Sequence, residues 1–220
     1  MQAADELPTA RKRPRPGERR TQILQILAEM LEQPGAERVT TAALAARLEV
    51  SEAALYRHFA SKAQMFEALI DFIESSIFGL INQISEREPD PQVRAARIVA
   101  MVLQFGEKNP GMTRVMVGDA LVFEHQRLQQ RMNLLFDKLE AALRQSLRST
   151  PDASEGEGNG GDDADRGAGG PLTPERDAQV QASALTAFVV GRLQRFARSG
   201  FKRSALEYRD ESLKLLLAGR

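Results

Sequence analysis

The chain has 220 residues, of which 42% are apolar and 5% are aromatic, and it contains no cysteine. Disulfide bonds and thiolate metal sites are therefore excluded, and nothing in the composition indicates secretion. The longest purely apolar run, residues 98–103, is far too short to span a bilayer. The N-terminus carries no apolar stretch of signal-peptide length. We therefore expect a cytoplasmic protein with no membrane contact.

The formal net charge is zero, but the charges are separated along the chain. Residues 11–20 hold six basic side chains against one acid, a net of +5, and residues 151–170 hold six acids against one base, a net of −5. A near-neutral isoelectric point therefore does not argue against nucleic-acid binding. Residues 1–16, with three prolines, predict a disordered basic arm. Residues 149–174, with seven glycines and many acids, predict a flexible loop.

Between these segments the sequence predicts helices only, because helix-forming residues dominate and no strand alternation occurs. We expect an all-α fold of about nine helices. They are a first helix from Glu18 to Pro34, two short helices after Thr40 and Ser51, a fourth from Ser61 to Pro89, a fifth over 92–108, a short one over 112–117, a long one over 119–148 and two more within 175–219.

Local signals support several of these helices. Thr40, Ser51 and Ser61 stand at expected N-caps, and Gln64 follows Ser61 at the capping-box spacing. The fifth helix is apolar almost all round, which predicts a central, buried helix. The fourth helix carries one apolar stripe at the helical period, formed by Phe66, Leu69, Ile70, Ile73, Ile77, Leu80, Ile81 and Ile84.

The two short helices joined by residues 49–51 fit a helix-turn-helix, although an ordinary corner between two helices gives the same pattern. The residues that open the second helix, 51–53, lack bulky side chains, so its N-terminus can approach base edges closely. Tyr56, Arg57 and His58 follow, and outward side chains there can reach phosphates. His58 equally fits a packed residue at a helix end.

Two further features favour DNA binding. Lys62 lies in the first turn of the fourth helix, where the helix dipole disfavours a cation and a bound phosphate would remove the conflict. The prolines of the basic arm keep it extended, as a segment that follows a groove or a backbone requires. The predicted DNA contacts are Thr40, Thr41, Ser51, Glu52, Ala53, Ala54, Tyr56, Arg57, His58 and Lys62, with Arg11, Lys12, Arg13 and Arg15 of the arm.

The stretch 40–66 resembles the DNA-binding domain of the TetR family of regulators. Five segments, SEAALYRHF, SKAQMFEALIDFIE, FGEKNPGMTR, FEHQRLQQRMNLLF and RFARSGFK, resemble one group within it, the nucleoid occlusion factors. The resemblance implies a DNA-binding domain over 17–62 and a helical regulatory and dimerisation domain over 63–220. It also implies a homodimer that binds palindromic sites in double-stranded DNA of the chromosome, and so a nucleoid-associated protein. A second implied activity is antagonism of FtsZ, a tubulin-like division protein.

In that group the surface between the fourth and fifth helices receives the FtsZ tail. Carried over by position, this implies an FtsZ-binding set of Phe72, Met101, Phe105, Lys108 and Asn109. Phe72 lies about 120° from the centre of the apolar stripe, so it is not expected on the main core face. It can line a groove, or it can simply pack on the fifth helix. Lys108 suits an acidic tail.

Other functions are weaker candidates. The only two histidines, His58 and His125, have no paired-histidine or Ser/His/Asp signature, so we expect no enzyme, no metal and no cofactor. His125 is expected on the surface of the long helix. The strongest alternative is a TetR-type repressor that responds to a small molecule. Its cavity would be lined by Met101, Phe105, Met112, Met116, Met132 and Phe136, although a methionine-rich stripe also fits plain core.

The last two helices combine large and small side chains, as close packing across a two-fold axis requires. The large ones are Leu185, Phe188, Val189, Leu193 and Phe196, and Arg192, Arg195 and Arg198 are expected at the rim of this dimer interface. One departure from the TetR pattern is Glu49, at a turn position usually held by glycine. If Glu49 is left-handed, the cost is roughly 1 kcal/mol.

Neutralising Arg11, Lys12, Arg13 and Arg15 should weaken DNA binding and flatten its salt dependence, by up to about 0.9 in slope for each phosphate that the arm no longer neutralises. Sequence preference should stay the same, because contacts to the DNA backbone carry no base information. Fluorescence anisotropy over a salt series measures both quantities. An unchanged affinity and slope would show that the arm does not contact DNA.

Overall fold

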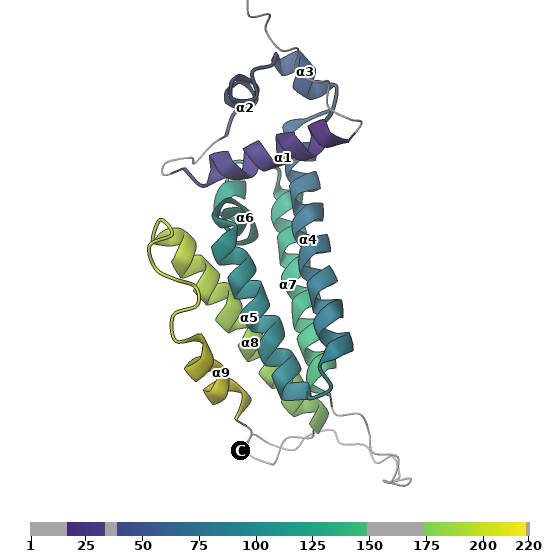
Figure 1. Cartoon of the computed structure of the whole chain (residues 1–220), viewed down its shortest axis with the longest axis vertical. Helices are drawn as coiled ribbons and strands as arrows, with labels where there is room; N and C mark the ends of the chain where they lie inside the picture. Colours follow the sequence, from purple (N-terminus) through teal and green to yellow (C-terminus); the bar gives the residue numbers. More distant parts are fainter. Residues whose placement is uncertain (1–16, 34–38, 149–173, 219–220) are drawn as a thin grey trace, which may run out of the picture.

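The computed structural model describes residues 17–33, 39–148 and 174–218, and these residues form helices without any strand (Figure 1). The all-α prediction is confirmed. The helices are α1 (Glu18–Leu31), α2 (Thr41–Arg47), α3 (Glu52–Tyr56), α4 (Lys62–Arg87), α5 (Pro91–Lys108), α6 (Pro110–Met116), the 3-10 helix η1 (Asp119–Leu121), α7 (Gln126–Leu147), α8 (Pro174–Arg198) and α9 (Arg209–Leu217). The predicted arm lies outside the described residues, as does the predicted loop apart from Pro174.

Helices α1, α2 and α3 form a small layer at one end, and α4 runs from it along a bundle with α5, α7 and α8 (Figure 1). One continuous hydrophobic core extends through both parts, from Ile23 on α1 to Leu217 on α9. Helix α5 is central, because α4, α6, α7, α8 and α9 all pack against it. It is nevertheless amphipathic rather than apolar all round, since Val93, Arg97 and Gln104 are exposed.

Three predicted caps are confirmed. The side chains of Thr40, Ser51 and Ser61 accept hydrogen bonds from the backbone N–H groups of Ala43, Ala54 and Gln64. The reciprocal bond of the capping box is shifted by one residue, because Gln64 Oε1 accepts from the N–H of Ala60 at 2.9 Å.

Two sequence predictions about the long helices were wrong. Helix α7 begins at Gln126 rather than at residue 119. Gly118 has a φ of 85°, and the residues directly after it form the short 3-10 helix η1 instead of the start of α7. His125 is exposed as expected, but its Nδ1 accepts from the N–H of Arg127 at 3.3 Å and caps α7. On α4, Leu80 is 39% exposed and therefore lies outside the buried stripe to which the sequence analysis assigned it.

The predicted dimer interface on α8 also needs correction. Leu185, Val189, Leu193 and Phe196 are buried in the core of the single chain. Arg192 is not on an interface rim, because its guanidinium donates to the carbonyl groups of Ala205 at 3.0 Å, Ser204 at 3.2 Å and Glu207. This side chain therefore holds the connection between α8 and α9.

Glu49 lies between α2 and α3 and has a φ of 55°, so it adopts the left-handed conformation considered in the sequence analysis. A glycine is usual where the turn needs this conformation, so Glu49 is tolerated at a cost of roughly 1 kcal/mol.

Gly111→Ala should lower the free energy of unfolding by about 3 kcal/mol or more. A Cβ at residue 111 would lie 2.0 Å from the carbonyl oxygen of Ala28, so α1 and α6 would have to separate. The control is Gly79→Ala on α4, where a Cβ would meet nothing within 4 Å. That variant should gain roughly 0.5–1 kcal/mol from helix propensity. Urea unfolding measures both, and equal effects would contradict the packing argument.

Candidate nucleic-acid interface

Helix α3 and the residues that flank it, 51–58, present most of the predicted DNA contacts outside the arm to solvent. It has five residues, which is too few for a helix that is stable alone, so tertiary contacts must hold it. The buried side chains of Leu55 and Phe59, each 1% exposed, supply the apolar part of that support. The exposed predicted contacts are Thr40, Ser51, Glu52, Ala53, Tyr56, Arg57 and His58, whereas Thr41 and Ala54 are half-buried.

Two predicted contacts are bonded to each other. Thr41 Oγ1 donates to Glu52 Oε2 at 2.6 Å, which joins the first turn of α2 to the first turn of α3. The carboxylate of Glu52 is therefore oriented by a neighbouring helix. The two helices of the predicted motif keep a fixed relation at this end.

Arg20 is a residue of this region that the sequence did not single out. Its Nη1 donates to the carbonyl oxygen of His58 at 2.7 Å, and its Cζ lies 4.1 Å from the centroid of the Phe59 ring. No local spacing points to this contact, because its partners are far along the chain. Only the fold brings α1 against the end of α3.

Lys62 has a partner within the protein. Its Nζ forms an ion pair with Glu124, which precedes α7, and it lies 5.6 Å from the centroid of the Phe66 ring. A bound phosphate was expected to offset the unfavourable helix dipole at Lys62, and in the free protein Glu124 supplies an anion there instead. Lys62 as a DNA contact stays a prediction. Arg11, Lys12, Arg13 and Arg15 lie outside the described residues.

A surface groove of about 400 Å³ lies beside Phe72, which is 48% exposed. Its walls come from α1, α4 and α6, so it differs from the surface between the fourth and fifth helices that the family resemblance implied. The exposure of Phe72 favours the groove over simple packing on α5. The lining residues are Thr21, Leu24, Gln25, Ala28, Glu29, Glu32, Leu69, Phe72, Asn109 and Met112.

The predicted FtsZ-binding residues divide around this groove. Phe72 and Asn109 line it, and Asn109 Nδ2 is fixed by the carbonyl oxygen of Phe105 at 2.7 Å. Met101 and Phe105 are half-buried and pack against the core, and neither lines the groove. Lys108 is exposed at the last position of α5, directly before Asn109.

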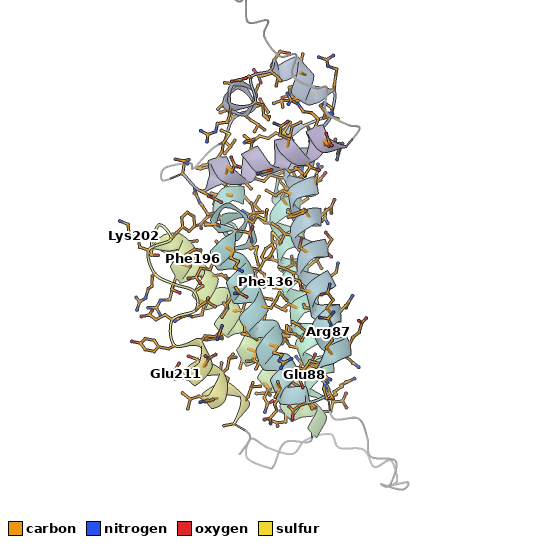
Figure 2. All side chains as sticks on the ribbon, in the orientation of Figure 1. Arg87, Glu88, Phe136, Phe196, Lys202 and Glu211 are labelled. Carbon is orange, nitrogen blue, oxygen red and sulfur yellow. The ribbon has the colours of Figure 1, made fainter. Side chains whose placement is uncertain are left out.

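The side chains proposed to line a small-molecule cavity do not form one lining. Met116 and Met132 are each 2% exposed and belong to the core. Phe136 packs against that core along the bundle (Figure 2). Met112 lies in the surface groove. Core packing therefore accounts for most of this methionine-rich stripe.

Among the residues that the structure describes, no three His, Cys, Asp or Glu side chains gather as a metal site. Within the same residues, no helix has both the length and the apolar character needed to cross a bilayer.

Comparison with known proteins decides the family. Residues 23–69 match the family model of bacterial regulatory proteins of the tetR family, and residues 90–164 match the SlmA-like model of the tetracyclin repressor-like C-terminal domain. The nucleoid occlusion factor SlmA of Photobacterium profundum is 47% identical over 201 residues, which is 91% of this chain and 94% of that protein. This chain belongs to the SlmA family of nucleoid occlusion factors. The resemblance inferred from the sequence is confirmed.

Other comparisons agree with the SlmA assignment. The SlmA protein of Salmonella paratyphi A is 50% identical over 185 residues, covering 84% of this chain and 85% of that protein. A TetR-like transcriptional regulator from Rhodococcus sp. RHA1 shares the fold, with a TM-score of 0.67 at 19% identity over 95% of this chain and all of that one. The SlmA relatives are named nucleoid occlusion factors, and the tetR family model describes regulatory proteins, so neither name is that of an enzyme.

If Lys62 binds a phosphate, Glu124→Gln should raise DNA affinity and steepen the salt slope by about 0.9. Without the carboxylate of Glu124, the ammonium group of Lys62 is free to pair with a DNA phosphate. The matched control is Glu88→Gln. Glu88 follows the far end of α4, its carboxylate is similarly buried, and it pairs with Arg97 on α5. Anisotropy titrations over a salt series test both variants. If Glu124→Gln and Lys62→Ala both leave affinity and slope unchanged, Lys62 serves the fold alone.

Proposed function

We propose that this protein is a DNA-binding cell-division inhibitor that binds palindromic chromosomal sites as a homodimer and antagonises FtsZ assembly over the nucleoid. The observation that carries the proposal is about half identity, over most of the chain, to proteins named nucleoid occlusion factors. The exposed helix-turn-helix supplies the surface for DNA, and the groove beside Phe72 supplies a separate surface for the division protein.

The DNA-binding part of the proposal rests on α3 and its surroundings. Ser51, Glu52 and Ala53 open α3 on the exposed side, where their side chains are short enough for close approach to base edges. Tyr56, with its side chain 45% exposed, and Arg57 lie at the other end of α3 and can contact the DNA backbone. One such helix reads few bases, so specificity requires two copies on half-sites about 34 Å apart or a multiple of that spacing.

The dimer surface that best fits the fold is the outward face of α7 and α8. These helices pack against each other, and their exposed faces carry Leu134, 56% exposed, and Val180, 50% exposed. Small residues at 183, 184, 187 and 191 follow Val180 along α8 and allow a second copy to approach closely. A two-fold axis across this face would bring the same surface from each copy together.

The groove beside Phe72 fits a short peptide with an apolar anchor. Leu24, Phe72 and Met112 provide apolar walls, and Asn109 provides an amide at the rim. Lys108 next to it suits an acidic segment, whereas Glu29 and Glu32 make the α1 side of the groove acidic. We therefore place the acidic part of the FtsZ tail toward the end of α5.

The experiment that tests the function is sedimentation of FtsZ polymers with this protein, with and without a duplex that it binds specifically. Loss of polymer from the pellet is expected. If the protein leaves the amount of sedimented FtsZ polymer unchanged both with and without the duplex, division control is wrong. A repressor that responds to a small molecule then becomes the better hypothesis.

Phe72→Ala and Lys108→Glu should each strongly reduce FtsZ antagonism and leave DNA affinity near the wild-type value. The first variant removes the apolar anchor, and the second adds repulsion against an acidic tail. Matched controls are Phe123→Ala, which removes another exposed aromatic, and Lys202→Glu, which reverses another exposed lysine. Wild-type antagonism by both groove variants would place the FtsZ contact elsewhere.

A further inference from the structure

A long-range polar contact from α1 holds the end of the recognition helix α3. Helix α3 ends at Tyr56, and the backbone continues through Arg57 and His58 to the buried ring of Phe59. Arg20 Nη1 donates to the His58 carbonyl oxygen at 2.7 Å, and the guanidinium Cζ lies 4.1 Å from the Phe59 ring centroid. A charged donor and a cation–π contact thus meet at this turn.

The opposite end of α3 is held separately. Ser51 caps the helix through the Ala54 N–H, and Glu52 accepts a hydrogen bond from Thr41 on α2. A five-residue helix has little stability of its own, so its direction depends on how these two ends are fixed. Among the described residues, Arg20 supplies the polar contact from another helix at the C-terminal end, beside the buried Phe59.

A basic residue at the start of α1 has a simpler explanation, because residues 11–20 form a cationic block that can neutralise phosphates. The geometry separates Arg20 from its neighbour Arg19. The Arg19 guanidinium donates only within α1, to Gln22 Oε1 at 2.7 Å, whereas that of Arg20 reaches across to α3. Two adjacent arginines of the same charge therefore have different structural partners.

We propose that Arg20 is a positioning residue for sequence-specific DNA binding, which fixes the angle of α3 through His58 and Phe59 and does not neutralise a phosphate. This inference rests on the proposed DNA-binding function. It differs from a phosphate contact in a measurable way. Removing a phosphate contact weakens binding to every duplex and lowers the salt slope, whereas a misplaced recognition helix weakens binding to the preferred sequence only.

The test compares Arg20→Gln with the control Arg19→Gln on two duplexes, at several salt concentrations. One duplex is selected by the wild-type protein from a random pool, and the other is a scrambled duplex of the same composition. Arg20→Gln should lower affinity for the selected duplex by roughly tenfold, the range for removal of a charge-assisted hydrogen bond. Affinity for the scrambled duplex and both salt slopes should stay close to wild type. Arg19→Gln should leave the ratio of the two affinities unchanged.

Arg20→Lys separates charge from geometry. Lysine keeps the charge but lacks the planar guanidinium that donates to His58 while lying on Phe59, so the affinity ratio should recover only in part. Full recovery of the ratio with lysine would overturn the proposal.

Two other outcomes would also overturn it. They are an equal loss on both duplexes with a salt slope lower by about 0.9, and no change with Arg20→Gln. Stoichiometric titration gives the fraction of each variant that is competent to bind DNA. If a smaller competent fraction accounts for the whole apparent loss of affinity, the variant is misfolded and the positioning role is contradicted. If the wild-type protein selects no sequence, the proposed function fails and this inference fails with it. The other outcomes overturn the inference alone.

Discussion

The contact between α1 and α6 at Gly111 is the constraint on which both candidate surfaces depend. A Cβ at this position would lie 2.0 Å from the Ala28 carbonyl oxygen, so the two backbones approach as closely as they do because residue 111 has no side chain. The position of α1 then sets two further features. One end of α1 carries Arg20 to the turn after α3, and its middle forms a wall of the groove beside Phe72. A shift of α1 would therefore alter both surfaces together.

Helix α4 is the second structural link between these surfaces, because it begins with Lys62 and also carries Phe72. Ion pairs hold it against α7, with Arg127 bonded to Glu67 at 2.7 Å and Arg131 to Asp71 at 2.6 Å. The hydrogen bond from Arg131 to Asp71 raises the pKa of the arginine, while burial opposes the rise. A partner bound in the groove would contact α1 and α4, the same two helices that reach the candidate DNA surface through Arg20 and Lys62.

The sequence predicted what depends on neighbours in the chain. Thr40, Ser51 and Ser61 were identified as caps because a cap is made within one turn, and the apolar periods located most helices. It could not predict contacts between distant segments. Glu124 opposite Lys62 and His58 opposite Arg20 follow no spacing rule, and they appear only once the helices are packed. The start of α7 was missed because residues 119–125 are compatible with a helix, and the turn depends on Gly118 and the cap at His125. On α8 the large side chains share one face of the helix, which the sequence analysis assigned to a second copy of the chain, and only the packed bundle shows that this face belongs to the core of the same chain.

The ends of α7 and α8 that flank residues 149–173 are joined by contacts of their own, on the side of the molecule opposite α2 and α3 (Figure 1). Arg148 forms an ion pair with Glu175, and Gln179 accepts from Arg144 at 2.9 Å and donates to Glu140 at 2.8 Å. These bonds join the last turns of α7 to the first turns of α8. A fluorescent protein inserted between these two helix ends would therefore be attached on the side of the molecule opposite α2 and α3 (Figure 1), and could report where the molecule lies in a living cell.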